Sequence, residues 1–102
     1  MLELRPNCEL CDRDLPPESE EARICSYECT FCAGCVESVL GNVCPNCGGG
    51  FEPRPIRPRN AWRDSTGLAH DPASHVRRQT SYRRAELDGF TQPLRGIPPR
   101  ER

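Results

Sequence analysis

Apolar residues follow a helical period in one short stretch of the chain, residues 33–40. Val36, Val39 and Leu40 stand at positions i, i+3 and i+4, a spacing that places their side chains on one face of a helix. Gly41 comes directly after them, and glycine is typical of the residue that ends a helix. We therefore expect a short helix over residues 33–40 with one apolar face.

The rest of the predicted core also lies in the first half of the chain. The segment Ala22–Ile24 predicts a short strand that leads into the cysteine-rich region. Tyr27 and Phe31 are expected to supply most of the aromatic core surface, and Phe51 is the last residue with a core-like character. These features predict a small folded domain over residues 1–51 with one short helix and little strand.

The second half, residues 52–102, has only scattered apolar residues among proline, arginine and other polar residues. Three prolines within residues 52–59 favour an extended segment. Asp71 followed by proline is typical of a helix start, and Gly89 of a helix stop. We expect a largely disordered Pro/Arg-rich tail with a transient helix over residues 72–88.

All eight cysteines lie in the first half, and they form pairs. Three pairs have the spacing C-x2-C and one has the spacing C-x3-C. Four thiolates make a closed, tetrahedral structural zinc site. Eight of them predict two zinc ions held by Cys8, Cys11, Cys25, Cys29, Cys32, Cys35, Cys44 and Cys47.

Size and cell compartment favour metal over disulfides. A domain of about fifty residues buries too little apolar surface to be stable without a covalent or metal staple. The segment Met1–Pro6 has no apolar run, so we expect no secretory signal, and no stretch is long enough to cross a bilayer. We therefore expect a cytoplasmic protein without a membrane partner, in which thiols stay reduced and bind metal.

Three arrangements of the cysteines compete. In a cross-brace, alternate pairs share an ion, whereas in a sequential arrangement neighbouring pairs do. An iron–sulfur cluster is the third, because Cys29, Cys32 and Cys35 match the start of a ferredoxin run, although the closing Cys-Pro is too distant. The spacing favours the cross-brace, which assigns Cys8, Cys11, Cys32 and Cys35 to site one, and Cys25, Cys29, Cys44 and Cys47 to site two.

The two halves of the chain differ in net charge as well as in cysteine content. Residues 1–51 hold nine acidic and three basic residues, a net charge of −6, and residues 52–102 hold six acidic and eleven basic residues, a net charge of +5, which sum to the −1 of the whole chain. Such a tail can fold back on the acidic domain or attract an anionic partner. Because its charges are interspersed, we expect a solvated tail. Every basic residue apart from the histidines is arginine.

The cysteine pattern resembles the RING-finger family over residues 8–47. The paired ligands, the long first loop, the tight central cluster and the closing Cys-Pro-x-Cys all match, with Leu10, Phe31 and Pro45 at the usual positions. The resemblance implies a cross-braced zinc fold and ubiquitin-ligase activity through a docking groove near Leu10, Val39 and the last knuckle. The basic residue that follows the last ligand in that family is Gly48 here.

The first half is also similar to a family of small bacterial cysteine-rich proteins known only as a domain of unknown function. The similarity rests on the segments Arg5-Pro6-Asn7-Cys8 and Cys44-Pro45-Asn46-Cys47-Gly48-Gly49, and it implies no activity.

These observations favour a non-catalytic zinc module that binds an unidentified protein partner. A RING-type ubiquitin ligase is one alternative, and an iron–sulfur or thiol redox sensor is another. Four cysteine pairs without a βαβ unit indicate ligands and not redox catalysis. Nucleic-acid binding would depend on tail arginines, because the cysteine-rich half is acidic: Arg77, Arg78, Arg83 and Arg84.

Overall fold

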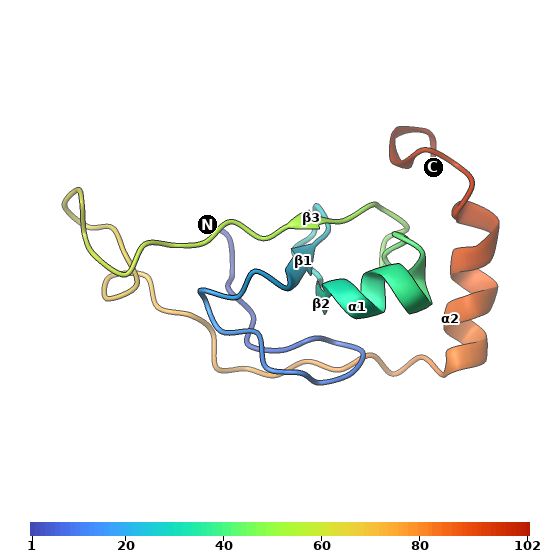
Figure 1. Ribbon diagram of the computed structural model, residues 1–102, viewed down its shortest axis with the longest axis horizontal. Helices are drawn as coiled ribbons and strands as arrows, with labels where there is room; N and C mark the ends of the chain where they lie inside the picture. Colours follow the sequence, from blue (N-terminus) through green and yellow to red (C-terminus); the bar gives the residue numbers. More distant parts are fainter.

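Three short antiparallel strands form the centre of the computed structural model, which describes residues 1–102 (Figure 1). β1 (Ala22–Ile24) lies between β2 (Thr30–Cys32) and β3 (Glu52–Pro53). Arg23 pairs with Phe31 on one side and with Pro53 on the other. The predicted strand at residues 22–24 is confirmed, whereas β2 and β3 were not predicted.

The helix expected over residues 33–40 is present in two parts. α1 (Ala33–Cys35) continues directly into a π-helical turn, η1 (Val36–Leu40). Val36 and Leu40 are buried in the core and Val39 is partly buried, as the apolar period predicts. Gly41 ends the helix in the left-handed region with φ of 56°, a conformation that glycine adopts without steric cost.

Aromatic packing in the core differs from the expectation at one residue. Phe31 is fully buried, and its ring meets that of Phe51 edge to face with centroids 5.5 Å apart. Tyr27, which was expected in the core, is 73% exposed. It lies in the turn between β1 and β2, where the Glu28 amide donates to the Cys25 carbonyl, and this turn directs the ring to solvent.

The second half of the chain, expected to be a disordered tail, wraps around the cysteine-rich half. After β3 the chain forms a loop that projects from one end, returns beside the N-terminal segment and leads into α2, beyond which a short segment reaches the C-terminus (Figure 1). Along the return, the Ser74 amide donates to the Leu4 carbonyl at 3.0 Å, and the Thr80 amide donates to the Glu9 carbonyl at 2.8 Å. The expectation of disorder is wrong because it considered apolar content alone and not hydrogen bonds.

One arginine next to β3 connects the two halves through its guanidinium. Arg54 is 4% exposed, and it donates to the carbonyls of Arg5 at 2.8 Å, Leu15 at 3.1 Å and Pro16 at 2.9 Å. Hydrogen bonds from a charged donor to buried carbonyls are stronger than those from a neutral donor. The guanidinium thus joins the loop of residues 12–21 to the end of the sheet.

Opposite charges also bring the two halves together at the surface. Arg77 contacts the carboxylates of Asp12 at 2.9 Å and Asp14 at 2.7 Å. Next to it, Asn7 and Arg78 exchange two hydrogen bonds between the Asn7 amide group and the Arg78 backbone. The basic second half therefore folds back on the acidic first half. The sequence had favoured a solvated tail instead, because its charges are interspersed.

The helix of the second half begins later than its cap residues suggested. α2 spans Arg84–Thr91, and residues 72–83 have no regular secondary structure. Gly89 lies inside this helix and does not end it. Two short 3-10 turns follow, η2 (Gln92–Leu94) and η3 (Pro99–Glu101). None of these helices is long and apolar enough to span a membrane.

Candidate metal centres

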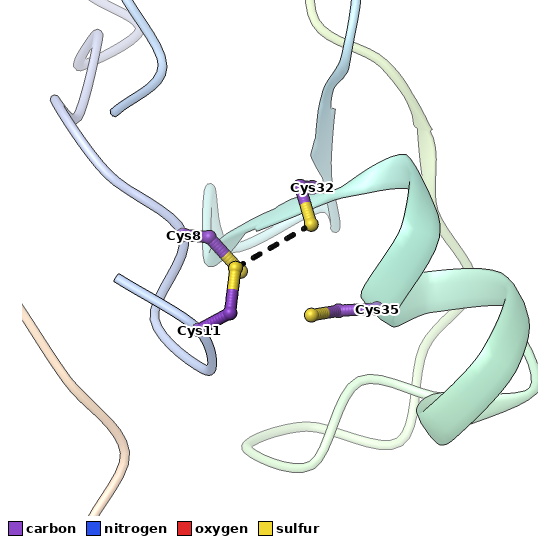
Figure 2. Close-up of side chains that lie close together, drawn as sticks. All are labelled: Cys8, Cys11, Cys32 and Cys35. Atoms are coloured by element: carbon purple, nitrogen blue, oxygen red, sulfur yellow. Dashed lines mark hydrogen bonds between the residues drawn. The ribbon is translucent and has the colours of Figure 1, made fainter. Parts of the chain in front are cut away.

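Four cysteines from the first and third pairs come together at site one. Cys8 and Cys11 lie on an N-terminal turn, which the Asp12 amide closes by donating to the Cys8 carbonyl at 2.9 Å. Cys32 ends β2 and Cys35 ends α1. Their four sulfur atoms lie within 4.8 Å of one another, and Figure 2 shows them pointing toward a common centre.

The spacing of these sulfur atoms suits a four-thiolate ion. A tetrahedral zinc with bonds of about 2.3 Å has sulfur–sulfur edges of about 3.8 Å. The Sγ atoms of Cys11 and Cys32 are 3.7 Å apart. A disulfide would need about 2.05 Å, and all eight cysteines are free thiols. The donor set of site one therefore fits a metal ion such as zinc.

Site two gathers the second and fourth pairs. The sulfur atoms of Cys25, Cys44 and Cys47 lie within 4.8 Å of one another. Cys29 is not part of that group of three, but it lies beside Cys25, whose backbone amide donates to the Cys29 carbonyl at 3.2 Å. Both sets therefore alternate along the chain, and they could each hold a metal ion in the cross-braced order. The sequential arrangement does not occur, because Cys8 and Cys25 belong to different sets.

Backbone amides point at sulfur in site two. The Tyr27 amide donates to the Cys25 Sγ, and the Gly49 amide donates to the Cys47 Sγ, each at 3.4 Å. Gly48 makes the second contact possible because its φ of 81° turns the chain tightly. Such amides stabilise negative charge on a ligating thiolate.

Burial and crowding act on the thiol pKa values. Burial, followed by the neighbouring thiols, raises the pKa of Cys35 well above that of a free thiol. Burial likewise raises the pKa of Cys44, with Cys25 and Cys29 adding to the effect. Four thiolates so close together repel one another unless a cation lies between them. A bound metal would supply that positive charge and take up all four thiolates.

A buried carboxylate and an amide connect the two sites, and the sequence analysis missed both. Glu9 lies between Cys8 and Cys11 and is 7% exposed. Its carboxylate accepts hydrogen bonds from the Thr30 amide at 3.0 Å, from Arg5 at 3.3 Å and from Asn46 at 3.2 Å. Burial raises the pKa of the Cys29 thiol, and Asn46 partly opposes this rise. A signal was available, since both residues stand inside a C-x2-C pair.

The comparison with known proteins concerns the part of the chain that contains the cysteines. The family described as "Protein of unknown function (DUF1272)" matches residues 1–57, more than half of the 102 residues. The chain belongs to this family. An uncharacterised protein of Rhizobium meliloti (strain 1021) is 69% identical over 58 residues, which are 57% of this chain and 69% of that relative. No solved structure matches the chain.

The DUF1272 domain therefore contains all eight cysteines, the three-stranded sheet and Arg54. It extends past Phe51, where the apolar pattern ends, because β3 and the Arg54 guanidinium complete the domain. The projecting loop, the returning segment and α2 lie outside the matched residues. No catalytic family is indicated.

Proposed function

We propose that the protein is a non-catalytic, two-zinc module for protein interaction that works in a reducing compartment. The observation that carries this proposal is the cross-braced grouping of the cysteines, four at site one and three at site two, with a separation of 3.7 Å between the Sγ atoms of Cys11 and Cys32 that suits a tetrahedral thiolate site. Such closed sites stabilise a fold and leave no open position for substrate.

The surroundings of the two sites support a structural role for the metal. The polar side chains beside the cysteines, Glu9 and Asn46, are occupied by hydrogen bonds within the domain. The cysteines gather in two separate groups, and none of them lines either cavity of the structure. We prefer zinc over an iron–sulfur cluster because the cysteine pairs alternate between the two sites. A ferredoxin run would also need its closing cysteine after fewer residues of sequence.

A ubiquitin-ligase function of the RING type is the second candidate, favoured by the cross-braced order of the pairs. Two features of the sequence weigh against it. Gly48 replaces the basic residue expected after the last ligand, and the chain has no lysine that could be modified in an autoubiquitination assay. The discharge of ubiquitin from a loaded conjugating enzyme would distinguish this candidate from the interaction module.

Nucleic acid is a weaker candidate as a partner. The four arginines considered for phosphate contact each lie within 4.0 Å of a carboxylate of the same chain: Arg77 of Asp12 and Asp14, Arg78 of Glu3, Arg83 of Glu86, and Arg84 of Asp88. A phosphate backbone would have to compete with these carboxylates.

Metal analysis tests the proposal directly. Protein purified without added metal is expected to contain two zinc ions per chain and to be colourless. Iron with acid-labile sulfide and a brown absorption spectrum would contradict the zinc module and favour a redox sensor.

A further inference from the structure

A short helix from outside the DUF1272 domain covers one face of that domain. α2 packs against η1 (Figure 1). Its Leu87 is 2% exposed and belongs to the same hydrophobic core as Val36 and Leu40 of η1. This face is formed by η1 and the last cysteine pair, and we call it the docking face: Val36, Val39, Leu40, Pro45 and Gly48.

Further apolar contacts extend across the docking face. A Cβ atom placed on Gly48 would be 3.4 Å from the Leu94 side chain and 3.8 Å from the Phe90 ring. Glycine at this position therefore lets both side chains approach the backbone of the last cysteine pair. Leu87, Phe90 and Leu94 together form the apolar surface that meets the docking face.

Arginines from the same segment hydrogen-bond to carbonyls at the end of η1. Arg95 Nη2 donates to the Val39 carbonyl at 2.5 Å. Arg102 Nη1 donates to the carbonyls of Asn42 at 2.9 Å and Gly48 at 3.0 Å. The last carbonyls of a helix have no partner within it, and cationic side chains are favourable there. The docking face thus offers an apolar surface beside carbonyls that accept from arginine.

The covering segment leaves part of this face unfilled. A cavity of about 310 Å³ remains between the last cysteine pair and α2, and it is lined by residues that include Tyr82 and Phe90. Both rings are nearly half exposed, at 46% and 44%. Gly89 weakens the helix although nothing lies within 4 Å of the Cβ that another residue would add. A helix of eight residues is marginal by itself, so the stability of α2 depends on its packing against the domain.

The family match includes the docking face but not α2, which covers it. Every residue of the docking face lies within residues 1–57, which match the DUF1272 family, and α2 lies outside that match. The apolar face is therefore part of the family domain, while the segment that covers it here is an addition to that domain.

We propose that the docking face is the binding site for an amphipathic helical segment of a partner protein, and that α2 occupies it until the partner binds. The partner segment would carry leucine, phenylalanine three residues later and an arginine near its C-terminal end, the pattern of Leu87, Phe90 and Arg95. This proposal rests on the proposed function and names the surface and the class of partner.

A labelled peptide with the sequence of residues 83–102 tests the proposal against the full chain in its metal-bound form. In the wild type, α2 is tethered and competes at an effective concentration in the millimolar range, so the peptide should bind weakly. In Leu87→Asp, α2 no longer covers the face, and the peptide should bind at least about tenfold more tightly by fluorescence anisotropy. A peptide that itself carries Leu87→Asp is the matched control and should not bind.

Gly89→Ala provides the opposite change in the full chain. It strengthens α2, so the peptide should bind about fivefold more weakly than to the wild type. If Leu87→Asp loses its metal, the double variant Phe90→Ala with Arg95→Ala replaces it, since both side chains are largely exposed and the domain core stays intact. The same increase in peptide binding is expected.

Two outcomes would overturn the proposal. The first is a variant that retains both metals and dispersed domain amides but does not bind the peptide. The second is a wild-type dimer that Leu87→Asp abolishes, because the occupant would then be a second copy of this chain. Either result differs from a failure of the proposed function, which metal analysis or a ubiquitin-discharge assay would reveal.

Discussion

The side-chain amide of Asn46 donates to the carboxylate of Glu9 at 3.2 Å, and this bond joins the turn of site one to the turn of site two. Glu9 stands between the first two cysteines and Asn46 between the last two. The same carboxylate accepts from the amide of Thr30, the first residue of β2. One buried acceptor therefore connects both metal centres with the sheet.

Replacing Glu9 by alanine should destabilise the domain by roughly 1–3 kcal/mol, because it leaves the buried Thr30 amide without an acceptor. The midpoint of urea unfolding at a fixed zinc concentration measures this loss. Glu18→Ala is the matched control, since Glu18 is exposed, and its change should stay within about 0.5 kcal/mol. Equal effects of the two variants would show that the bridge contributes nothing.

Cadmium-113 NMR can test the cross-brace. Protein loaded with cadmium should give two resonances, one for each site. Cys11→Ser and Cys35→Ser should each shift one resonance strongly, whereas Cys25→Ser and Cys47→Ser should shift the other, because the pairs alternate between the sites. A strong shift of the same resonance by Cys11→Ser and Cys25→Ser would contradict this grouping.

Removal of the metal should unfold the DUF1272 domain. Structural zinc contributes on the order of 10–16 kcal/mol to small domains of this kind, more than a core of this size can replace. After chelation, amide dispersion in an NMR spectrum should be lost for residues 8–51 and also for α2, because Leu87 packs in the same core. Dispersion that survives chelation would rule out a structural role for the metal.

Arg54→Ala should cost about 3 kcal/mol, because three carbonyls lose a charged donor, one of them in a buried bond and two in partly buried bonds. Thermal unfolding of the zinc-bound protein measures the change. Arg59→Ala removes an arginine that is exposed, and it should leave the melting temperature nearly unchanged. Burial lowers the pKa of Arg54, but the guanidinium remains charged at neutral pH.

Trypsin should cut the projecting loop before it cuts the returning segment. Arg59 and Arg63 are exposed there, whereas Arg77 is bonded to Asp12 and Asp14. The two fragments should then elute together at low ionic strength, because α2 and the arginine contacts hold the second fragment. Initial cleavage at Arg77 or Arg78 would indicate that the returning segment is not packed on the domain.

The sequence was sufficient for the parts of the fold that have a strong local signal. The cysteine spacing predicted the grouping that the structure shows, and the apolar period predicted the helix at residues 33–40. The strand at Ala22–Ile24 followed from its position before Cys25. Each of these signals lies within a few residues of the element that it predicts.

The packing of the second half had no such signal. It depends on single residues: Leu87 supplies one buried side chain, and Arg54 donates to carbonyls that every residue possesses. A low apolar content predicted disorder, because neither backbone acceptors nor one isolated leucine change a composition. The prediction that Tyr27 lies in the core was wrong for a related reason, because only the conformation of the turn around it determines the direction of the ring.

The alternation of the two cysteine sets has a consequence for how this domain can evolve. Any break in the chain between Cys11 and Cys44 separates the members of at least one set, so neither half can fold as an autonomous knuckle. Gene fusion, duplication or truncation can therefore transmit this unit only as a whole, with variation confined to its flanks. The segment after residue 57, where the family match ends, is one such flank.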